Sequence, residues 1–174
     1  MRVIWLWRFI AYSFCGFLLE VAFARLTGHR KRDRKCFILL PLCPVYGLGA
    51  VLILFFAELL APGPLGVMAV GFFAASAAEY LMGLFYEKAL GIRFWDYSAM
   101  PLNLHGRVCL AFSACWSLLA LALVYWAAPR MDALLLRVPP GLLPPAVILL
   151  LCDGAVSAFA LRRTGTPEVL RWYR

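Results

Sequence analysis

The sequence predicts an all-α fold, a polytopic membrane bundle of five transmembrane helices, on three observations. Hydrophobic residues make up 64% of the 174 residues, and the mean hydropathy is +0.84, which lies well outside the range of soluble proteins. Five apolar stretches each approach the roughly 20 residues that cross a bilayer as a helix. None of them alternates apolar and polar residues as a membrane β-barrel does, so helices are predicted.

The five spans are expected, within one transmembrane domain over 1–174, at Val3–Ala24, Pro44–Leu60, Gly66–Tyr86, Val108–Trp126 and Pro144–Leu161. The sequence APGPL at 61–65 predicts a tight turn, so the second and third spans should form an antiparallel hairpin. Residues 129–143 contain three prolines and are expected to be an irregular connection. The basic segment TGHRKRDRK is too polar to bury and should be solvated or lie against lipid headgroups.

The positive charges are distributed unevenly between the two ends of the predicted bundle. Thirteen of the 17 Lys and Arg residues fall on the side that holds the first and third connections and the C-terminal tail. The positive-inside rule therefore predicts an N-terminus outside and a C-terminus in the cytoplasm. This distribution indicates topology and contact with anionic membrane lipids, and no nucleic-acid partner is expected.

A polar segment, RFWDYSAMPLNLHGR at 93–107, lies between two apolar runs. Proline and glycine interrupt any helix there, and the freed backbone groups need protein, water or ligand partners. Asn103, His105 and Arg107 offer hydrogen-bond donors to an anionic or carbonyl-bearing solute, and Asp96 can pair with Arg93 or Arg107. The alternative is an interfacial loop whose charges satisfy one another, with its aromatic residues as headgroup anchors.

Two glutamates lie within predicted spans, where ionisable residues are costly and usually functional. Glu79 is in the middle of the third span and Glu20 lies nearer the end of the first. Glu79 is expected to face the bundle interior and to pair with Arg107 or with the backbone of 101–106. The alternative is that each glutamate pairs with an arginine or a backbone group and only fixes packing. Glu58 is interpreted as reaching toward the membrane surface, and Asp153 has no motif around it.

The two glutamates also suggest an internal repeat. Glu20 is followed 21 residues later by Pro41-Leu42, and Glu79 is followed 22 residues later by Pro101-Leu102. Because the first and third spans run in the same direction, spans one and two would repeat spans three and four in parallel, as in the halves of several transporters.

Signatures of several enzyme classes are missing from the sequence. It contains no GxxxxGK[ST] phosphate loop, no HExxH metal spacing and no GxSxG elbow, so these routes to nucleotide, metal or serine chemistry are excluded. No cofactor is expected, and the chain is not expected to be an enzyme by itself.

Four segments resemble one known family: FCGFLLE at 14–20, PLCPVYGLGA at 41–50, AEYL at 78–81 and WDYSAMPLNLHGRVC at 95–109. Together they are similar to the CmpB-type ABC-transporter permease family of bacterial membrane proteins, over about residues 9–126. The matching characteristic residues are Glu20, Pro41, Pro44, Tyr46, Gly47, Glu79, Glu87, Trp95, Asp96, Tyr97, Asn103, Gly106 and Arg107. His105 occupies a position that varies in that family. The resemblance implies solute movement across a bacterial inner membrane together with a separate ATPase subunit.

The leading hypothesis is a permease-like transport component with a buried polar site and an unknown small solute or lipid as substrate. The predicted substrate-binding residues are Glu20, Glu79, Glu87, Asp96, Asn103 and Arg107. One alternative is a membrane enzyme acting on a lipid-borne substrate at the cytoplasmic interface through Asp96, His105 and Arg107. Another is a non-catalytic scaffold. Transport requires a cavity that reaches toward the middle of the membrane, an enzyme requires one that opens sideways to lipid near the inner surface, and a scaffold requires closely packed spans.

Overall fold

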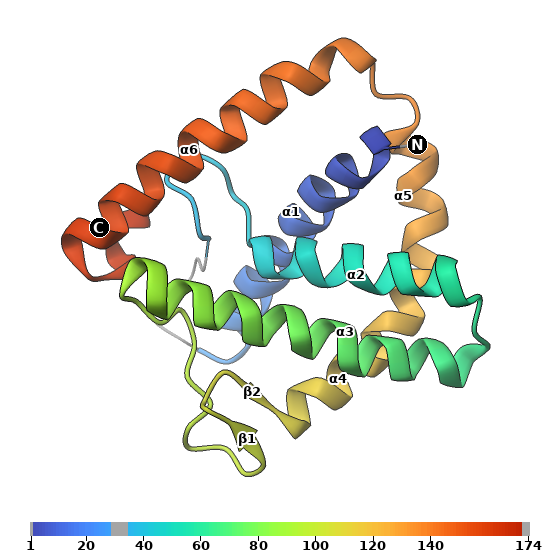
Figure 1. The fold of residues 1–174 in the computed structure, drawn as a ribbon, viewed down its shortest axis with the longest axis horizontal. Coiled ribbons are helices and arrows are strands. Elements are labelled where there is room, and N and C mark those ends of the chain that lie inside the picture. Colours follow the sequence, from blue (N-terminus) through green and yellow to red (C-terminus); the bar gives the residue numbers. More distant parts are fainter. Residues whose placement is uncertain (1, 29–34, 172–174) are drawn as a thin grey trace.

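The computed structural model describes residues 2–28 and 35–171, and it contains six α-helices in that part of the chain (Figure 1). They are α1 (Arg2–Leu26), α2 (Pro44–Leu60), α3 (Pro64–Phe85), α4 (Leu110–Ala122), α5 (Ala128–Leu135) and α6 (Leu143–Thr164). Two π-helical turns extend them, η1 (Tyr86–Leu90) after α3 and η2 (Leu123–Ala127) between α4 and α5. Short 3-10 turns lie at Pro140–Leu142 and Pro167–Leu170. Residues 29–34 of the predicted basic loop lie outside the described residues.

The predicted helical membrane bundle is confirmed. In the described part of the chain four helical stretches are long and apolar enough to cross a bilayer: Ile4–Leu26, Pro64–Leu90, Leu110–Leu135 and Pro140–Thr164. The remaining predicted span is α2, an apolar helix of 17 residues. At 1.5 Å per residue it is about 25 Å long, near the lower limit for crossing the hydrocarbon layer.

The fourth span is longer than expected. It was predicted to end at Trp126 and to give way to an irregular connection, but helix continues through η2 and α5 to Leu135. Pro129 lies in the first turn of α5, directly after the π-helical turn. The wider turn interrupts the regular hydrogen-bond ladder there, so the missing N–H of proline is tolerated.

The first four spans pack in chain order, α1 on α2, α2 on α3 and α3 on α4. Glycines allow close approach at two of these contacts. A Cβ at Gly47 would lie 2.5 Å from the Phe9 carbonyl oxygen, and one at Gly71 would lie 3.0 Å from the Trp116 carbonyl oxygen. The helix backbones therefore nearly touch at these points.

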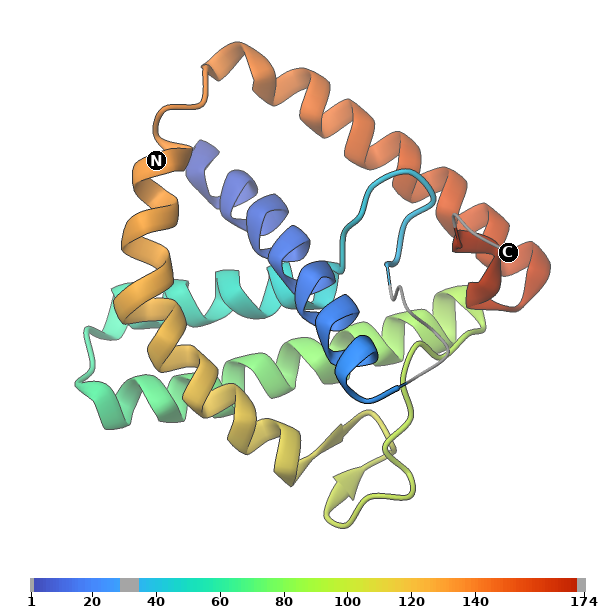
Figure 2. The same ribbon diagram turned by 180° about the vertical axis from the view of Figure 1, so that it is seen from behind.

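The connections divide between two ends of the molecule, and both views agree on this (Figures 1 and 2). The N-terminal end of α1, the α2–α3 turn and the α5–α6 connection lie at one end. Residues 91–109 and the C-terminal end of the described chain lie at the other. Segment 91–109 includes a small antiparallel hairpin of β1 (Asn103–Leu104) and β2 (Val108–Cys109).

Asp153 has a clear role although no sequence motif surrounds it. The segment that precedes α2 rises toward the middle of α6 (Figure 1). Asp153, which is buried, accepts hydrogen bonds from the backbone N–H groups of Leu39 at 3.1 Å and Leu40 at 2.7 Å. The Ser157 hydroxyl accepts another from Ile38 at 2.9 Å. The carboxylate therefore satisfies irregular backbone that would be costly to leave unpaired inside a membrane.

At the opposite end a buried arginine joins three helices. Arg8 of α1 donates to the two carboxylate oxygens of Asp132 in α5, at 2.9 and 2.6 Å. It also pairs with Glu58 of α2 at 2.7 Å. The sequence interpretation of Glu58 as an acid reaching for the membrane surface was incomplete, because its charge is matched within the protein.

Candidate functional site

A cavity of about 350 Å³ lies between those halves of α1, α2, α3 and α4 that are nearer to segment 91–109. Glu20 and Glu79, the two acids that the sequence singled out, both line it. The other walls come from aromatic and apolar residues, among them Tyr46, Trp95, Tyr97 and Trp116. The cavity thus has two carboxyl groups in mainly apolar surroundings, where charge is expensive to leave unmatched.

Glu79 faces the bundle interior, as predicted, with 4% of its surface exposed. One of its oxygens accepts a hydrogen bond from the Tyr97 hydroxyl at 2.8 Å. The other accepts one from the Trp116 indole N–H at 3.3 Å. Both donors are neutral, and no lysine or arginine of the described residues pairs with this acid. The prediction that Glu79 pairs with Arg107 was wrong, although its partner Tyr97 does belong to the 93–107 segment.

Glu20 forms a similar arrangement on the facing side of the cavity. The Tyr46 hydroxyl donates a hydrogen bond to Glu20 at 2.6 Å. Each acid therefore accepts a hydrogen bond from a tyrosine, Tyr46 of α2 or Tyr97 of the 91–109 segment. The two tyrosines are not equivalent in the predicted repeat, because Tyr46 follows Pro41 whereas Tyr97 precedes Pro101. The parallel repeat stays a prediction.

Arg107 belongs to an ionic network beside the cavity. It pairs with Glu87, which also binds Arg93 at 3.0 Å. The Tyr80 hydroxyl lies 3.5 Å from Arg107 and 3.0 Å from His105. Pairing with Glu87 raises the pKa of the Arg107 guanidinium above its ordinary value. Arg93 also pairs with Asp96 at 3.3 Å, so two arginines face two acids. The network connects η1, which follows α3, to the residue before β2.

Asp96 and Asn103 shape the loop itself. Asp96 accepts a hydrogen bond from the Ser98 amide at 2.9 Å, and hydrogen bonds from Ser98, with a smaller contribution from Arg93, lower the pKa of Asp96. The Asn103 side chain donates to the Met100 carbonyl at 2.8 Å and accepts from the Gly106 amide at 3.0 Å. Gly106 has φ +68°, and a Cβ there would lie 2.7 Å from an Asp96 carboxylate oxygen. Only glycine fits this corner.

The conformation of this loop places the Tyr97 side chain at the cavity. The Tyr97 amide donates to the Gly106 carbonyl at 2.8 Å, and its ring stacks on Phe112 of α4 with ring centres 4.9 Å apart. Trp95 is fixed by a hydrogen bond from its indole N–H to the Arg107 carbonyl at 2.8 Å. The polar residues of 93–107 thus hold the aromatic residues that reach the acid.

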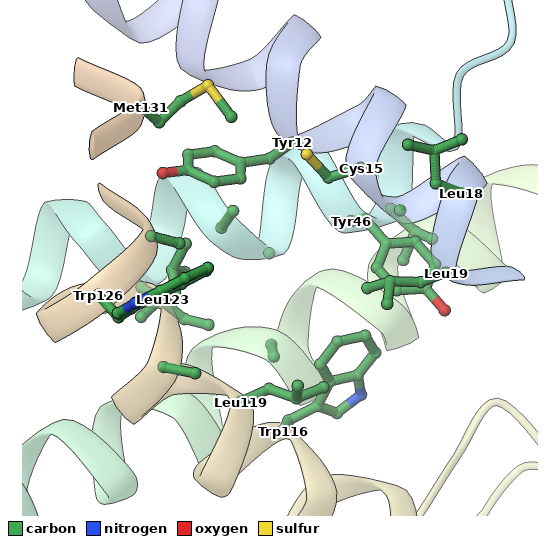
Figure 3. A pocket seen from close by; sticks show the side chains of 18 of the residues that line it. Tyr12, Cys15, Leu18, Leu19, Tyr46, Trp116, Leu119, Leu123, Trp126 and Met131 are labelled. Atoms are coloured by element: carbon green, nitrogen blue, oxygen red, sulfur yellow. The ribbon is translucent and has the colours of Figure 1, made fainter. Parts of the chain in front are cut away.

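A second, larger cavity of about 710 Å³ lies among α1, α2 and the α4–η2–α5 helix. Its walls are apolar, and residues such as Leu119, Leu123, Trp126 and Met131 project into it (Figure 3). It shares five lining residues with the acid cavity: Leu19, Val45, Tyr46, Trp116 and Leu119. The rings of Tyr46 and Trp116 meet edge to face at 5.3 Å on this shared wall. The two cavities are therefore adjacent chambers, which we call the acid chamber and the apolar chamber.

Tyr12 lines the apolar chamber, and its hydroxyl oxygen is buried. Its side chain is 6% exposed, and its hydroxyl has no hydrogen-bond partner among the described residues. Figure 3 places this hydroxyl near Met131, at the end of the chamber away from the Tyr46 hydroxyl and the Trp116 indole nitrogen. Buried hydroxyls are normally hydrogen-bonded, so this one is an exception in the apolar wall.

Comparison with known families places this arrangement in context. The family described as "Putative ABC-transporter type IV" (ABC_trans_CmpB) matches residues 7–158. The chain belongs to this family. No curated protein and no solved structure matches it. The family match includes Asp153 and Ser157, so it extends beyond the expected 9–126 into α6, the helix that anchors the segment before α2.

Within this ABC-transporter family member, the six predicted site residues fall into two groups. Glu20 and Glu79 line the acid chamber, whereas Glu87, Asp96, Asn103 and Arg107 build the loop beside it; a role of the latter four in substrate binding stays a prediction. Sequence analysis did not single out Trp116, because a tryptophan in an apolar span has no distinguishing pattern. It treated Tyr97 as a headgroup anchor, since only the fold shows that the loop turns this ring inward.

Proposed function

We propose that this protein is the membrane-embedded component of a transporter and that substrate passes through the two adjacent chambers. The observation that carries the proposal is the shared wall of Tyr46 and Trp116 between them. The acid chamber is bordered by residues of the loop end, such as Phe94 and Trp95. The apolar chamber reaches Arg130 and Leu134 at the opposite end. Movement of the two rings would connect the chambers into one path.

In this proposal Glu20 and Glu79 form the substrate-binding site. They are the acidic residues in the wall of the acid chamber, and among the described residues Glu79 accepts hydrogen bonds from the neutral donors Tyr97 and Trp116. Interior sites with a few convergent polar groups are the usual form of small-molecule sites. The chain has no phosphate loop of its own, so energy would come from a separate ATPase subunit, as the family description suggests.

The alternative of a membrane enzyme has less support. Of the three residues assigned to it, Arg107 and His105 meet at the Tyr80 hydroxyl, but Asp96 is occupied by Ser98 and Arg93. Arg107 is already paired with Glu87. A pure scaffold has less support too, because closely packed spans would not enclose chambers of this size.

The two most buried cysteines provide a test of the path. Cys43 and Cys109 are each 2% exposed, but Cys43 lines the acid chamber whereas Cys109 contacts the Met100 sulfur. We would keep one or the other as a single cysteine and measure its reaction with 2-aminoethyl methanethiosulfonate in sealed vesicles from the native host. Cys43 should react at least tenfold faster than Cys109, because only Cys43 faces a chamber open to small solutes.

ATP distinguishes a transporter from a static cavity. Adding ATP to native vesicles, which retain the ATPase partner, should change the labelling rate of Cys43 several-fold and leave that of Cys109 unchanged. Equal rates at the two cysteines, or a Cys43 rate that does not respond to ATP, would contradict the proposed transport function.

A further inference from the structure

The wall between the two chambers is held by hydrogen bonds to the acids. Trp116 and Tyr46 line both chambers, and their rings meet edge to face with centres 5.3 Å apart (Figure 3). The Trp116 indole N–H donates to Glu79 at 3.3 Å, and the Tyr46 hydroxyl donates to Glu20 at 2.6 Å. Each ring of the wall is therefore tied to a carboxyl group, so a change in that group should alter the position of the ring.

The two oxygens of Glu79 have unequal hydrogen bonds. Tyr97 donates to Oε1 at 2.8 Å, whereas Trp116 donates to Oε2 at 3.3 Å. Both donors are neutral, no lysine or arginine of the described residues pairs with Glu79, and only 4% of its surface is exposed. An unmatched charge at such a site is costly, and a proton removes it. Because the longer hydrogen bond stabilises charge less, Oε2 is the oxygen that should take the proton.

The two donors respond differently to a proton on Oε2. The proton turns this oxygen into a neutral hydroxyl group, which is a weaker acceptor than a carboxylate oxygen. A tyrosine hydroxyl can donate or accept, but an indole N–H can only donate. Tyr97 therefore keeps its bond to Oε1, while Trp116 loses the bond that holds its ring in the wall.

We infer that Glu79 is a proton-binding site that controls the wall between the chambers. With Glu79 ionised, Trp116 is held against Tyr46 and the wall is closed; with a proton on Oε2, Trp116 is released and the chambers join. The only covalent change is transfer of a proton from solvent to Oε2. This inference rests on the proposed transport function, of which it names the regulation. The apolar chamber, of about 710 Å³, lies beside the ring and has room to receive it.

The other groups around Glu79 that can carry charge are already engaged or are neutral in their ordinary form. Glu20 of α1 accepts from Tyr46 and has a further interaction within the chain. Beside the chamber, Glu87 and Arg107 pair with each other, and His105 lies 3.0 Å from the Tyr80 hydroxyl. The remaining side chains of the chamber wall that can ionise are phenols and thiols: Cys36, Cys43, Tyr46, Tyr97 and Cys115.

The test is NMR of the purified full chain in detergent with isotope-labelled tryptophan, between about pH 5 and pH 8. The Trp116 indole N–H signal is identified by its absence from Trp116→Phe. Trp95 is the internal control, because its indole N–H donates to the Arg107 carbonyl, which does not titrate. As the pH falls, exchange of the Trp116 N–H with water should become about tenfold faster or more relative to Trp95, as expected for a lost hydrogen bond to a charged group. The nuclear Overhauser contact between the rings of Trp116 and Tyr46 should weaken over the same range.

Three variants identify the group that takes up the proton. Glu79→Gln should abolish the pH dependence of the Trp116 signals. Glu20→Gln, in the other acid of the chamber, should retain it. His105→Gln should retain it too, and it is needed because histidine is the side chain that ordinarily changes charge near neutral pH. If Glu79→Gln does not yield folded protein, retention of the pH dependence in both other variants still supports Glu79, and its loss in either one contradicts it.

Two results would overturn the inference. One is a ratio of Trp116 to Trp95 exchange, or a ring contact, that stays constant between about pH 5 and pH 8. The other is a pH dependence that persists in Glu79→Gln, because another group would then control the wall. ATP-dependent labelling of Cys43 would stand after either result, so failure of the proton site is distinguishable from failure of the transport function.

Discussion

At the scale of single residues, the polar segment 93–107 acts on the interior through one side chain, Tyr97. The Tyr97 hydroxyl donates the shorter of the two hydrogen bonds to Glu79, at 2.8 Å, and the Trp116 indole N–H donates the other at 3.3 Å. The charged residues around it pair with one another or with backbone groups. The loop thus positions a hydrogen-bond donor, Tyr97, against a buried acid. Substituting Tyr97 and substituting the charged residues that support it should therefore have different outcomes.

Tyr97→Phe should keep the ring on Phe112 and remove only the donor to Glu79. A hydrogen bond to a buried acid contributes about 1.5 kcal/mol, so we expect the free energy of unfolding to fall by about that amount. Unfolding in a graded detergent series measures it. Tyr125→Phe, on a half-exposed side chain of the span that contains Phe112, is the control. An unchanged unfolding midpoint for Tyr97→Phe would contradict the importance of this contact.

Arg107→Ala should loosen the loop without leaving Glu79 unpaired, since the partner of Arg107 is Glu87. We expect a lower melting temperature than for Arg93→Ala, because the Arg107 side chain is 13% exposed and that of Arg93 is 50% exposed. In the Arg107→Ala and Glu87→Gln pair the two losses should be less than additive. Strictly additive losses would indicate that the two residues act independently.

The sequence identified the acids of the site but not their partners. Glu20 and Glu79 stand out because a carboxyl group inside an apolar span is rare and costly. Arg107 was a plausible partner for Glu79 by charge alone. The outcome differs because Glu87 lies about two helical turns closer to the loop than Glu79, in η1, where it pairs with both Arg107 and Arg93. Charge pairing inside a loop cannot be assigned before the loop's path is known.

At the scale of elements, hydropathy located the helices well but not their ends. The bounds predicted for α2 are those observed, and α6 starts one residue earlier and ends three residues later than predicted. The errors occur where π-helical turns extend the third and fourth spans, because these turns leave no signal in hydropathy. The hairpin of β1 and β2 was not predicted either, since two-residue strands are too short for a periodic pattern.

Asp153 links two elements that are far apart in sequence, and its removal should separate them. Asp153→Asn removes the charge and one of the two oxygens that accept from the Leu39 and Leu40 amides. We expect a loss of about 2 kcal/mol in unfolding free energy, because hydrogen bonds to charged groups are the stronger ones. Hydrogen exchange of the 36–42 peptide should become faster, while the α2–α3 turn is unaffected. Glu168→Gln, on an exposed acid after α6, is the control, and equal exchange in both variants would rule out this anchoring role.

At the scale of the whole molecule, the arrangement of ends and the distribution of charge agree. The C-terminal ends of α1, α3 and α6 lie toward the end with segment 91–109, whereas the N-terminal end of α1 and α5 lie toward the end with the α2–α3 turn (Figures 1 and 2). The first group of elements and segment 91–109 carry Arg25, Lys88, Arg93, Arg107 and Arg162, and the second carries Arg8 and Arg130. Because positive residues are retained on the cytoplasmic side, the acid chamber should lie toward the cytoplasm and the apolar chamber toward the outside.

Cysteine labelling in intact cells tests this orientation. In a cysteine-free background we would place single cysteines at exposed positions of the two ends, Gly63→Cys and Gly141→Cys at one and Lys88→Cys and Glu168→Cys at the other. A membrane-impermeant maleimide should label the first pair in intact cells and the second pair only after permeabilisation. Labelling of the second pair alone in intact cells would mean that the protein has the opposite orientation, with the acid chamber toward the outside. Labelling of Gly63→Cys together with Lys88→Cys would mean that α3 does not cross the membrane, and a path through both chambers could not then connect its two sides.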